Sequence, residues 1–176
     1  SKICYINYPI DKSDEFITIA TTRPETMFGD TAIAVNPKDK RFSNFVGKTV
    51  TIPIVGRKIK IKKDNYADPK QGTGALKITP AHDFNDYDVG QRNKLEIINI
   101  FTKDGKINKN SPVNYIGLDR FEARKKILKE LKEKNFFVKE VNIKNKIPYG
   151  DRSNSIIEPY LTEQWFVNAK KLSVKA

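Results

Sequence analysis

Short runs of alternating apolar and polar residues divide this chain, and glycine, proline or asparagine ends most of them. Such alternation favours β-strands, because successive side chains of a strand point to opposite faces. Turn composition at Val55-Gly56-Arg57 and Asp104-Gly105 predicts tight connections between neighbouring runs. The runs predicted as strands are Phe16–Thr21, Ala32–Val35, Thr49–Ile54, Lys58–Ile61, Ala75–Thr79 and Ile97–Phe101.

Two segments have helical signatures. One begins at Asp119, whose Asp-x-x-Glu spacing is that of a capping box, and extends to about Lys134. The other is short, from about Asp83 to Asn93, with Asp83 and Asp86 spaced as a capping pair. The longer helix has an apolar face made of Phe121, Ala123, Ile127, Leu128 and Leu131. Many strands and two helices predict a β-rich α+β fold, a barrel-like domain of short strands with two peripheral helices.

The length of 176 residues fits one domain with a real core. We predict a single domain over residues 1–167, with residues 1–10 and 148–176 as connectors toward a larger protein. The chain starts at Ser1 without an initiator Met, which suggests a piece of something larger. Residues 156–167 contain the only tryptophan and are predicted to form an apolar, aromatic strand.

The charge balance and the scarce cysteine and histidine limit the possible partners and cofactors. Net charge is +12, which suits a phosphate-rich partner such as RNA, although a lysine-biased proteome would give the same balance. Cys4 and His82 are the only residues of their types, so an internal disulfide framework and a Cys/His zinc site are excluded. No apolar run approaches the roughly 18 residues that a membrane span needs. A reducing, cytoplasmic setting without metal or membrane is therefore expected.

Two stretches carry far more polar groups than strand connections need. Thr21–Thr31 reads TTRPETMFGDT, and Gly72–Tyr87 reads GTGALKITPAHDFNDY, with its glycines, a strand, the only histidine and two carboxylates. Lys77 and Thr79 lie on the same face of the predicted strand. This density predicts a small polar pocket, while helix capping, an exposed strand face and ordinary turns remain structural alternatives for the same residues.

These two motifs, extended to GTGALKITPAHDFNDYDVG, and the terminal YGDRS and IIEPYLTEQWFV resemble the editing insertion of valyl-tRNA synthetase, a class I aminoacyl-tRNA synthetase. The resemblance covers nearly the whole chain. Glu25, Asp30-Thr31 and the Leu-Thr-x-Gln-Trp tail distinguish it from the leucyl and isoleucyl enzymes. It implies a hydrolase that cleaves the ester of threonyl-tRNA(Val), with threonyl-adenylate as a second candidate substrate. Such editing is needed because a valine pocket rejects threonine only about a hundredfold.

The resemblance also implies catalytic roles for three residues. Asp86 would bind the α-ammonium of the substrate, and Asp83 would bind the threonine hydroxyl or cap the helix. Lys77 would lie near the substrate carbonyl or ribose. Water would attack the carbonyl, polarised by Lys77 or backbone amides, and the neighbouring ribose hydroxyl would help to move the proton. No protein nucleophile is expected, since the sequence contains no Ser-His-Asp pattern.

The implied substrate-binding residues are Thr21, Thr22, Arg23, Thr79, His82, Gly72, Thr73 and Gly74. The first three would contact the ribose, the terminal adenosine and the carbonyl, and Thr79 would supply a hydroxyl. His82 is a candidate for proton transfer because a free imidazole titrates near neutrality, although a lone histidine in a turn is more often structural. Gln71 departs from the family, which often has an aromatic residue there, and this puts stacking at that position in doubt.

The resemblance implies partners and leaves alternatives. The expected partners are the tRNA(Val) acceptor end carrying threonine and the catalytic domain of a parent synthetase, to which the two connectors would lead. No cofactor is expected in this domain, since ATP would be used by the parent. The alternatives are a leucyl- or isoleucyl-type editing domain and a non-catalytic, basic tRNA-binding module.

Overall fold

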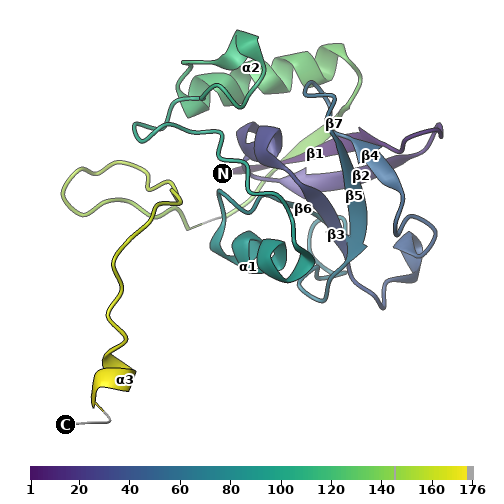
Figure 1. The fold of residues 1–176 in the computed structure, drawn as a ribbon. Coiled ribbons are helices and arrows are strands. Elements are labelled where there is room, and N and C mark those ends of the chain that lie inside the picture. The colour runs from purple at the N-terminus through teal and green to yellow at the C-terminus, as the bar shows by residue number, and fades with distance from the viewer. Residues whose placement is uncertain (145, 174–176) are drawn as a thin grey trace.

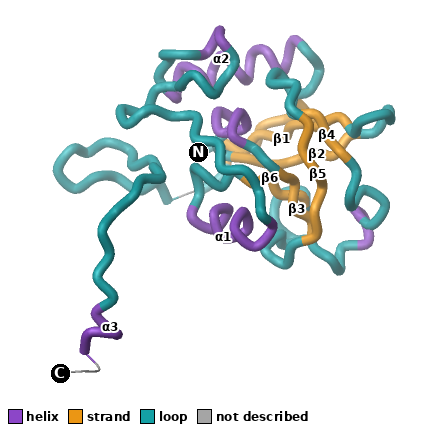
Figure 2. The backbone as a smooth tube through the Cα atoms, viewed as in Figure 1, coloured by secondary structure: helices purple, strands orange, loops and turns teal. Residues whose placement is uncertain are grey.

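The computed structural model describes residues 1–144 and 146–173, and it is rich in short strands (Figures 1 and 2). Among these residues no helix has the length and apolar composition to cross a membrane. The strands are β1 (Lys2–Pro9), β2 (Phe16–Thr21), β3 (Ala32–Val35), β4 (Thr49–Thr51), β5 (Lys58–Lys63), β6 (Ala75–Ile78) and β7 (Phe137–Asn142). The α-helices are α1 (Phe84–Asn93), α2 (Arg120–Glu133) and α3 (Ala169–Leu172), and the 3₁₀ helices are η1 (Pro24–Gly29), η2 (Lys40–Phe42) and η3 (Val113–Tyr115).

Two sheets form the body of the molecule. The first has the strand order β2-β1-β7 and is antiparallel, and the second has the order β4-β5-β3-β6 with β3 and β5 parallel. A bridge between Ile10 and Val50 joins the sheets at one corner, and β2 lies beside β6 at another. The predicted strand-rich α+β fold is confirmed. The sheets are open, however, so the expected barrel-like closure is only approximate.

The core lies between the two sheets and beneath α2. Alternate residues of β1 and β2 point into it, including Ile6, Tyr8 and Ile19, each with no exposed surface. The helix α2 covers the sheet β2-β1-β7 and the 3₁₀ helix η1 (Figure 1), and it buries Ala123, Ile127 and Leu131. Phe121 and Leu128, also predicted for this face, are only partly buried. Helical periodicity therefore identified the packing side of α2 correctly.

Two predicted strands are not formed. Residues 97–101 run as an extended loop, because the Ile100 N–H donates to the His82 imidazole and the side chain of Asn108 donates to the carbonyls of Asn99 and Phe101. Only Phe101 makes an isolated bridge, to Ile107, around the predicted Asp104-Gly105 turn.

Residues 156–167 are not a strand either. Ile156 makes one isolated bridge to Tyr149, and the side chains of Trp165 and Phe166 are almost fully exposed. Without a neighbouring strand in the described structure, their apolar alternation has no ladder to join.

The predicted connectors differ in structure. Residues 1–10 contain β1, the central strand of the three-stranded sheet, and Ile6 and Ile10 belong to the core. The final residues of the other connector, 174–176, lie outside the described part of the chain. Within its described part, Ile156 and Glu158 contact Arg120 of the body, and the chain beyond them extends outward to α3 (Figure 1). A connecting role for either segment stays a prediction.

Gly90 sets how closely α1 approaches the loop after β6. A Cβ at this position would lie 2.9 Å from both Cβ and Cγ of Pro80, whose ring cannot move aside easily. Gly-to-Ala changes in helices normally stabilise by about 1 kcal/mol. We expect Gly90→Ala to do the opposite and to destabilise by about 1–3 kcal/mol through overpacking. Urea unfolding of the variant measures this, and a stabilised variant would contradict the close contact.

Candidate active site

A hollow of about 230 Å³ lies where the ends of β2 and β6 meet η1 and the start of α1. Residues from both polar motifs meet there, as the sequence predicted, since β2 and β6 lie side by side. Its wall is formed by Ile3, Ala20, Thr21, Thr22, Arg23, Thr26, Tyr66, Leu76, Lys77, Thr79, His82, Asp83 and Asp86. The hollow is therefore small, and polar side chains make up most of its wall.

Lys77 is buried beneath this hollow and has no free proton to offer. Its ammonium group donates to Thr26 Oγ1 at 2.8 Å, to Asp30 Oδ1 at 2.8 Å and to Thr79 Oγ1 at 2.5 Å. An ammonium group has three donors, so all of them are used within the protein. Lys77 therefore fixes the positions of Thr26, Asp30 and Thr79. It could contact a substrate carbonyl only if one of these hydrogen bonds broke.

Asp30 is the centre of this buried network, and the sequence analysis did not place it in the site. Its side chain has no exposed surface and accepts hydrogen bonds from Lys77, from Thr79 Oγ1 at 2.7 Å and from the Tyr8 hydroxyl at 2.8 Å. Its position inside the first polar motif, directly after Gly29, was the only available signal. Sequence spacing alone does not show that Asp30 faces Lys77, because they come from different segments of the fold.

The two predicted carboxylates of α1 have different tasks. Asp83 is the N-cap and accepts from the backbone N–H groups of Asn85 and Asp86 through Oδ1. The Asp86 side chain does not accept a hydrogen bond from the Asp83 backbone N–H, as a capping box would require. Its Oδ2 accepts from the Thr79 N–H at 2.8 Å, which ties α1 to the end of β6. The capping-pair prediction is therefore correct only for Asp83, while both carboxylates line the hollow.

Burial raises the pKa of the Asp86 carboxyl to about 6, against the opposing effects of the nearby Lys77 ammonium and the Thr79 N–H. Only 7% of Asp86 is exposed. At neutral pH the group is a desolvated carboxylate whose charge is only partly compensated. Such a carboxylate favours a cationic ligand, because pairing with a positive charge offsets the free-energy cost of its desolvation.

His82 is built into the structure as a neutral ring. Its Nε2 accepts from the Ile100 N–H at 3.0 Å, and its ring packs edge-on against Phe101. Burial, Arg23 and Lys77 together lower the pKa of His82 to about 3. The lone pair of Nε2 is thus occupied, and the structural alternative accounts for this residue better than proton transfer does.

We expect the imidazole of His82 to stay neutral between pH 5 and pH 8. It is the only histidine of the chain, so its ring signals in a proton–nitrogen NMR spectrum need no further assignment. A titration midpoint near the ordinary value of about 6.5 would contradict the buried, hydrogen-bonded ring.

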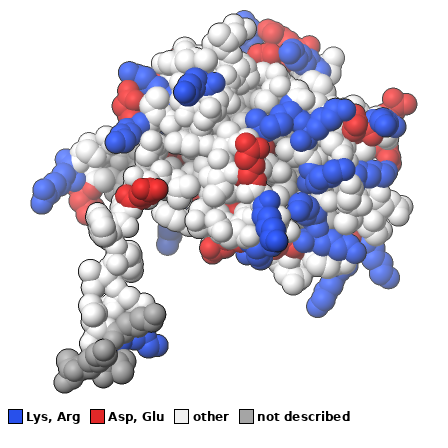
Figure 3. Space-filling model, viewed as in Figure 1, with Lys and Arg blue, Asp and Glu red and all other residues white. Residues whose placement is uncertain are grey.

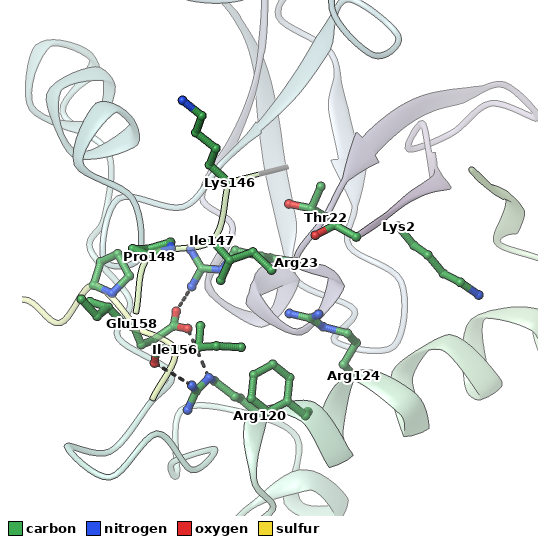
Figure 4. Close-up of a pocket in the computed structure, with 14 residues that line it drawn as sticks. Lys2, Thr22, Arg23, Arg120, Arg124, Lys146, Ile147, Pro148, Ile156 and Glu158 are labelled. Atoms are coloured by element: carbon green, nitrogen blue, oxygen red, sulfur yellow. Dashed lines mark hydrogen bonds and ion pairs between the residues drawn. The ribbon is translucent and has the colours of Figure 1, made fainter. Parts of the chain in front are cut away.

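Thr21, Thr22 and Arg23, at the end of β2 and just after it, also line the hollow. Thr21 Oγ1 accepts from the Arg23 N–H at 3.0 Å, which fixes the turn after β2. Arg23 Nη1 donates to the His82 carbonyl at 2.8 Å, and its Nη2 forms an ion pair with Glu158 (Figure 4). Thr22 is half-buried, and within the described residues its hydroxyl makes no hydrogen bond.

The glycine turn lies in a neighbouring hollow. Gly72, Gly74 and Gln71 line a space of about 370 Å³ that shares Ala20 and Tyr66 with the first hollow. Gly74 has a φ of +85°, a backbone conformation that favours glycine over residues with a Cβ. Thr73 lines neither hollow, and its hydroxyl bonds with the backbone of Ala75.

The 3₁₀ helix η1, which carries part of the first motif, is held in place by an ion pair with α2. Glu25 has no exposed surface and accepts two hydrogen bonds from Arg124 of α2, at 2.7 and 2.6 Å. The two parallel bonds hold η1 against α2. The sequence had suggested that Glu25 shapes this loop, but its partner Arg124 was missed, because an arginine on a helix surface normally points to solvent.

Comparison with known proteins gives three findings. A family model described as "Leucyl-tRNA synthetase, editing domain" matches residues 40–118. The valine–tRNA ligase of Pelagibacter ubique (strain HTCC1062) is 80% identical over 176 residues, and that of Thermotoga maritima (strain ATCC 43589) is 52% identical over 176 residues. Each match covers 100% of this chain and 20% of the relative, so the chain spans about a fifth of the length of these relatives.

Among solved structures, the fold is similar to LeuRS in the LeuRS-tRNA-LeuAMS ternary complex from Agrobacterium radiobacter K84. The TM-score is 0.65 with 22% sequence identity, and the match covers 80% of this chain and 20% of that chain. At this identity the likeness concerns the fold alone.

Proposed function

Because this chain belongs to the valine–tRNA ligase family and corresponds to its editing domain, we propose that it hydrolyses the ester bond of threonyl-tRNA(Val). The small hollow beside η1 would hold the threonyl group. Its partners would be the tRNA(Val) acceptor end and the catalytic domain of the parent synthetase, reached through the chain ends. A cytoplasmic location belongs to the same proposal.

The observation that carries this proposal is the buried carboxylate of Asp86 on the wall of a small hollow. An aminoacyl ester presents a primary ammonium group, and Asp86 is the desolvated anion that can pair with it. The neighbouring Asp83 carboxylate can accept a hydrogen bond from a threonine hydroxyl. Valine has a methyl group at that place and would leave the carboxylate without its partner, which disfavours binding of valine.

The proposed reaction uses water as the nucleophile. A water oxygen adds to the ester carbonyl carbon, the bond from that carbon to the ribose oxygen breaks, and a proton passes to the departing ribose oxygen through the neighbouring ribose hydroxyl. Asp86 holds the ammonium in place, and Arg23 and Thr22 are the polar groups available to the ribose and the carbonyl. Lys77 acts through Thr79 and Thr26, whose hydroxyls it orients. No step in this domain passes through a cofactor, and ATP would serve the parent enzyme.

The deciding experiment is hydrolysis of threonyl-tRNA(Val) by this chain, with valyl-tRNA(Val) as the control substrate. Release of threonine well above the spontaneous rate, with little release of valine, supports the proposal. Misacylated tRNA(Leu) and tRNA(Ile) tested in parallel separate a leucyl- or isoleucyl-type editor. Cleavage of those esters in preference to the threonyl ester would overturn the assignment to valine.

One observation favours a second candidate, a non-catalytic tRNA-binding module. Lys58, Lys60 and Lys63 are exposed on β5, and Figure 3 shows lysine and arginine side chains gathered over β4 and β5. Such a surface attracts phosphates whether or not the hollow is active. Salt-dependent binding of tRNA without release of any amino acid would favour this candidate.

A further inference from the structure

A short segment from the tail folds back on the rim of the hollow. Residues 148–159, here called the strap, form a small loop closed by the bridge between Tyr149 and Ile156 and by the bond from the Ile157 N–H to the Pro148 carbonyl at 3.0 Å. A third hollow, of about 240 Å³, lies between the strap and α2 and shares Thr22 and Arg23 with the candidate site. The strap therefore borders the same arginine as the candidate site.

The strap is held by one carboxylate between two guanidinium groups (Figure 4). Glu158 forms ion pairs with Arg23 and with Arg120 Nε, the latter at 3.4 Å. Arg120 also donates from Nη2 to the Ile156 carbonyl at 3.0 Å. The exposed fractions of the side chains are 16% for Glu158, 28% for Arg23 and 13% for Arg120, so this cluster is largely removed from water.

Glu158 offsets one of the two positive charges that meet in this cluster. Two guanidinium groups that face one carboxylate carry a net charge of +1, and without the carboxylate they would repel each other at short range. Within the described residues, Glu158 is the one carboxylate that forms an ion pair with Arg23. Without the charge of Glu158, the Arg23 guanidinium would keep its hydrogen bond to the His82 carbonyl. The Arg23 side chain would then tend to rotate toward solvent.

We propose that Glu158 is a positioning residue, which holds the Arg23 guanidinium at the rim of the hollow and thereby couples the strap to substrate binding. This inference rests on the proposed function for the contact between Arg23 and the tRNA end. Arg120 fixes the other side of Glu158, so the strap, Arg23 and α2 meet in one charge cluster.

The test begins with Glu158→Gln, which keeps the size of the side chain and removes its charge. We expect the KM for threonyl-tRNA(Val) to rise about tenfold while kcat changes less than twofold, because a lost contact present in both ground and transition states appears in KM. Glu158→Asp retains the charge on a shorter side chain, and its KM is expected to lie between those of the wild type and Glu158→Gln. An unchanged KM for Glu158→Gln would overturn the proposal.

A double-mutant cycle separates positioning from a general structural effect. In an Arg23→Gln background, Glu158→Gln is expected to raise KM no further, because the residue it positions is already absent. An equal, additive rise in that background would overturn the proposal. Glu140→Gln, which breaks the exposed pair with Lys2, is the matched control and is expected to leave KM unchanged.

A readout that needs no activity distinguishes failure of this inference from failure of the proposed function. The Arg23 side-chain Nε–H signal in an NMR spectrum is expected to be ordered and slow to exchange in the wild type, and to broaden or exchange faster in Glu158→Gln. If the wild type releases no threonine, the proposed function fails, and this comparison still decides whether Glu158 holds Arg23. Identical Arg23 signals in both proteins would overturn the positioning role.

Discussion

Replacing Asp86 with asparagine is expected to lower kcat/KM for threonyl-tRNA(Val) by about a hundredfold. This corresponds to a loss of roughly 2.7 kcal/mol, within the range found when one partner of a desolvated charge pair is removed. Asparagine keeps an oxygen that can accept the Thr79 N–H bond, so the link between α1 and β6 is retained. The variant therefore removes the charge with little change in structure, and steady-state release of threonine measures the effect.

The pKa of Asp86 gives this prediction a second, independent readout. Burial raises the pKa from 3.8 to about 6, so the folded protein binds more protons than the unfolded chain between these values. The stability associated with this group is fully present below pH 4 and is lost as the pH rises through about 6. The loss amounts to roughly 3 kcal/mol at pH 7.5. Asp86→Asn has no such titration and should gain stability relative to the wild type as the pH rises.

Activity should follow the opposite course. Only the carboxylate form pairs with an ammonium group, so the ratio of wild-type to Asp86→Asn activity should fall as the pH drops below about 6. Asp88→Asn is the matched control, since Asp88 lies on the exposed side of the same helix. It is expected to retain wild-type activity. An Asp86→Asn variant as active as Asp88→Asn would show that the ammonium is bound elsewhere.

Local sequence patterns predicted the helices and strands of this fold better than the way in which the strands assemble into sheets. Alternation identified the buried strands β2, β3 and β6, and apolar periodicity identified α2. The central strand β1 was missed because residues 1–10 were interpreted as a connector. Residues 97–101 had strand composition, yet several of their backbone groups bond to the side chains of His82 and Asn108 instead of a neighbouring strand. Partners distant in sequence decided these cases, and a single sequence does not reveal them.

The candidate site shows the same division. The two polar motifs contributed most of the side chains that line the hollow, so the sequence predicted that these motifs would meet. The role of each side chain was harder to predict. Lys77 and His82 have chemistry suited to catalysis, but the structure uses their polar atoms internally. Asp30 and Glu158 were missed as partners of Lys77 and Arg23, because each of these ion pairs joins two segments that are distant in the sequence.

Replacing Asp30 with asparagine is expected to destabilise the protein by about 3–5 kcal/mol, the usual cost of leaving a buried charge without its partner. Only 8% of the Lys77 side chain and none of the Asp30 side chain is exposed, so water does not replace the missing carboxylate. The change also weakens the acceptor for Tyr8 and Thr79. Urea unfolding at pH 7 measures the loss, with an unchanged m-value required for a two-state comparison.

A double variant tests whether this cost arises from the unpaired charge. Asp30→Asn combined with Lys77→Met removes both charges, and it should be more stable than Asp30→Asn alone because no cation is left buried. Glu140→Gln breaks an exposed pair and should unfold as the wild type does. A double variant less stable than Asp30→Asn would mean that Lys77 stabilises the fold through Thr26 and Thr79 instead. In that case the two hydroxyls, and the wall of the hollow that they form, would depend on Lys77 without needing Asp30.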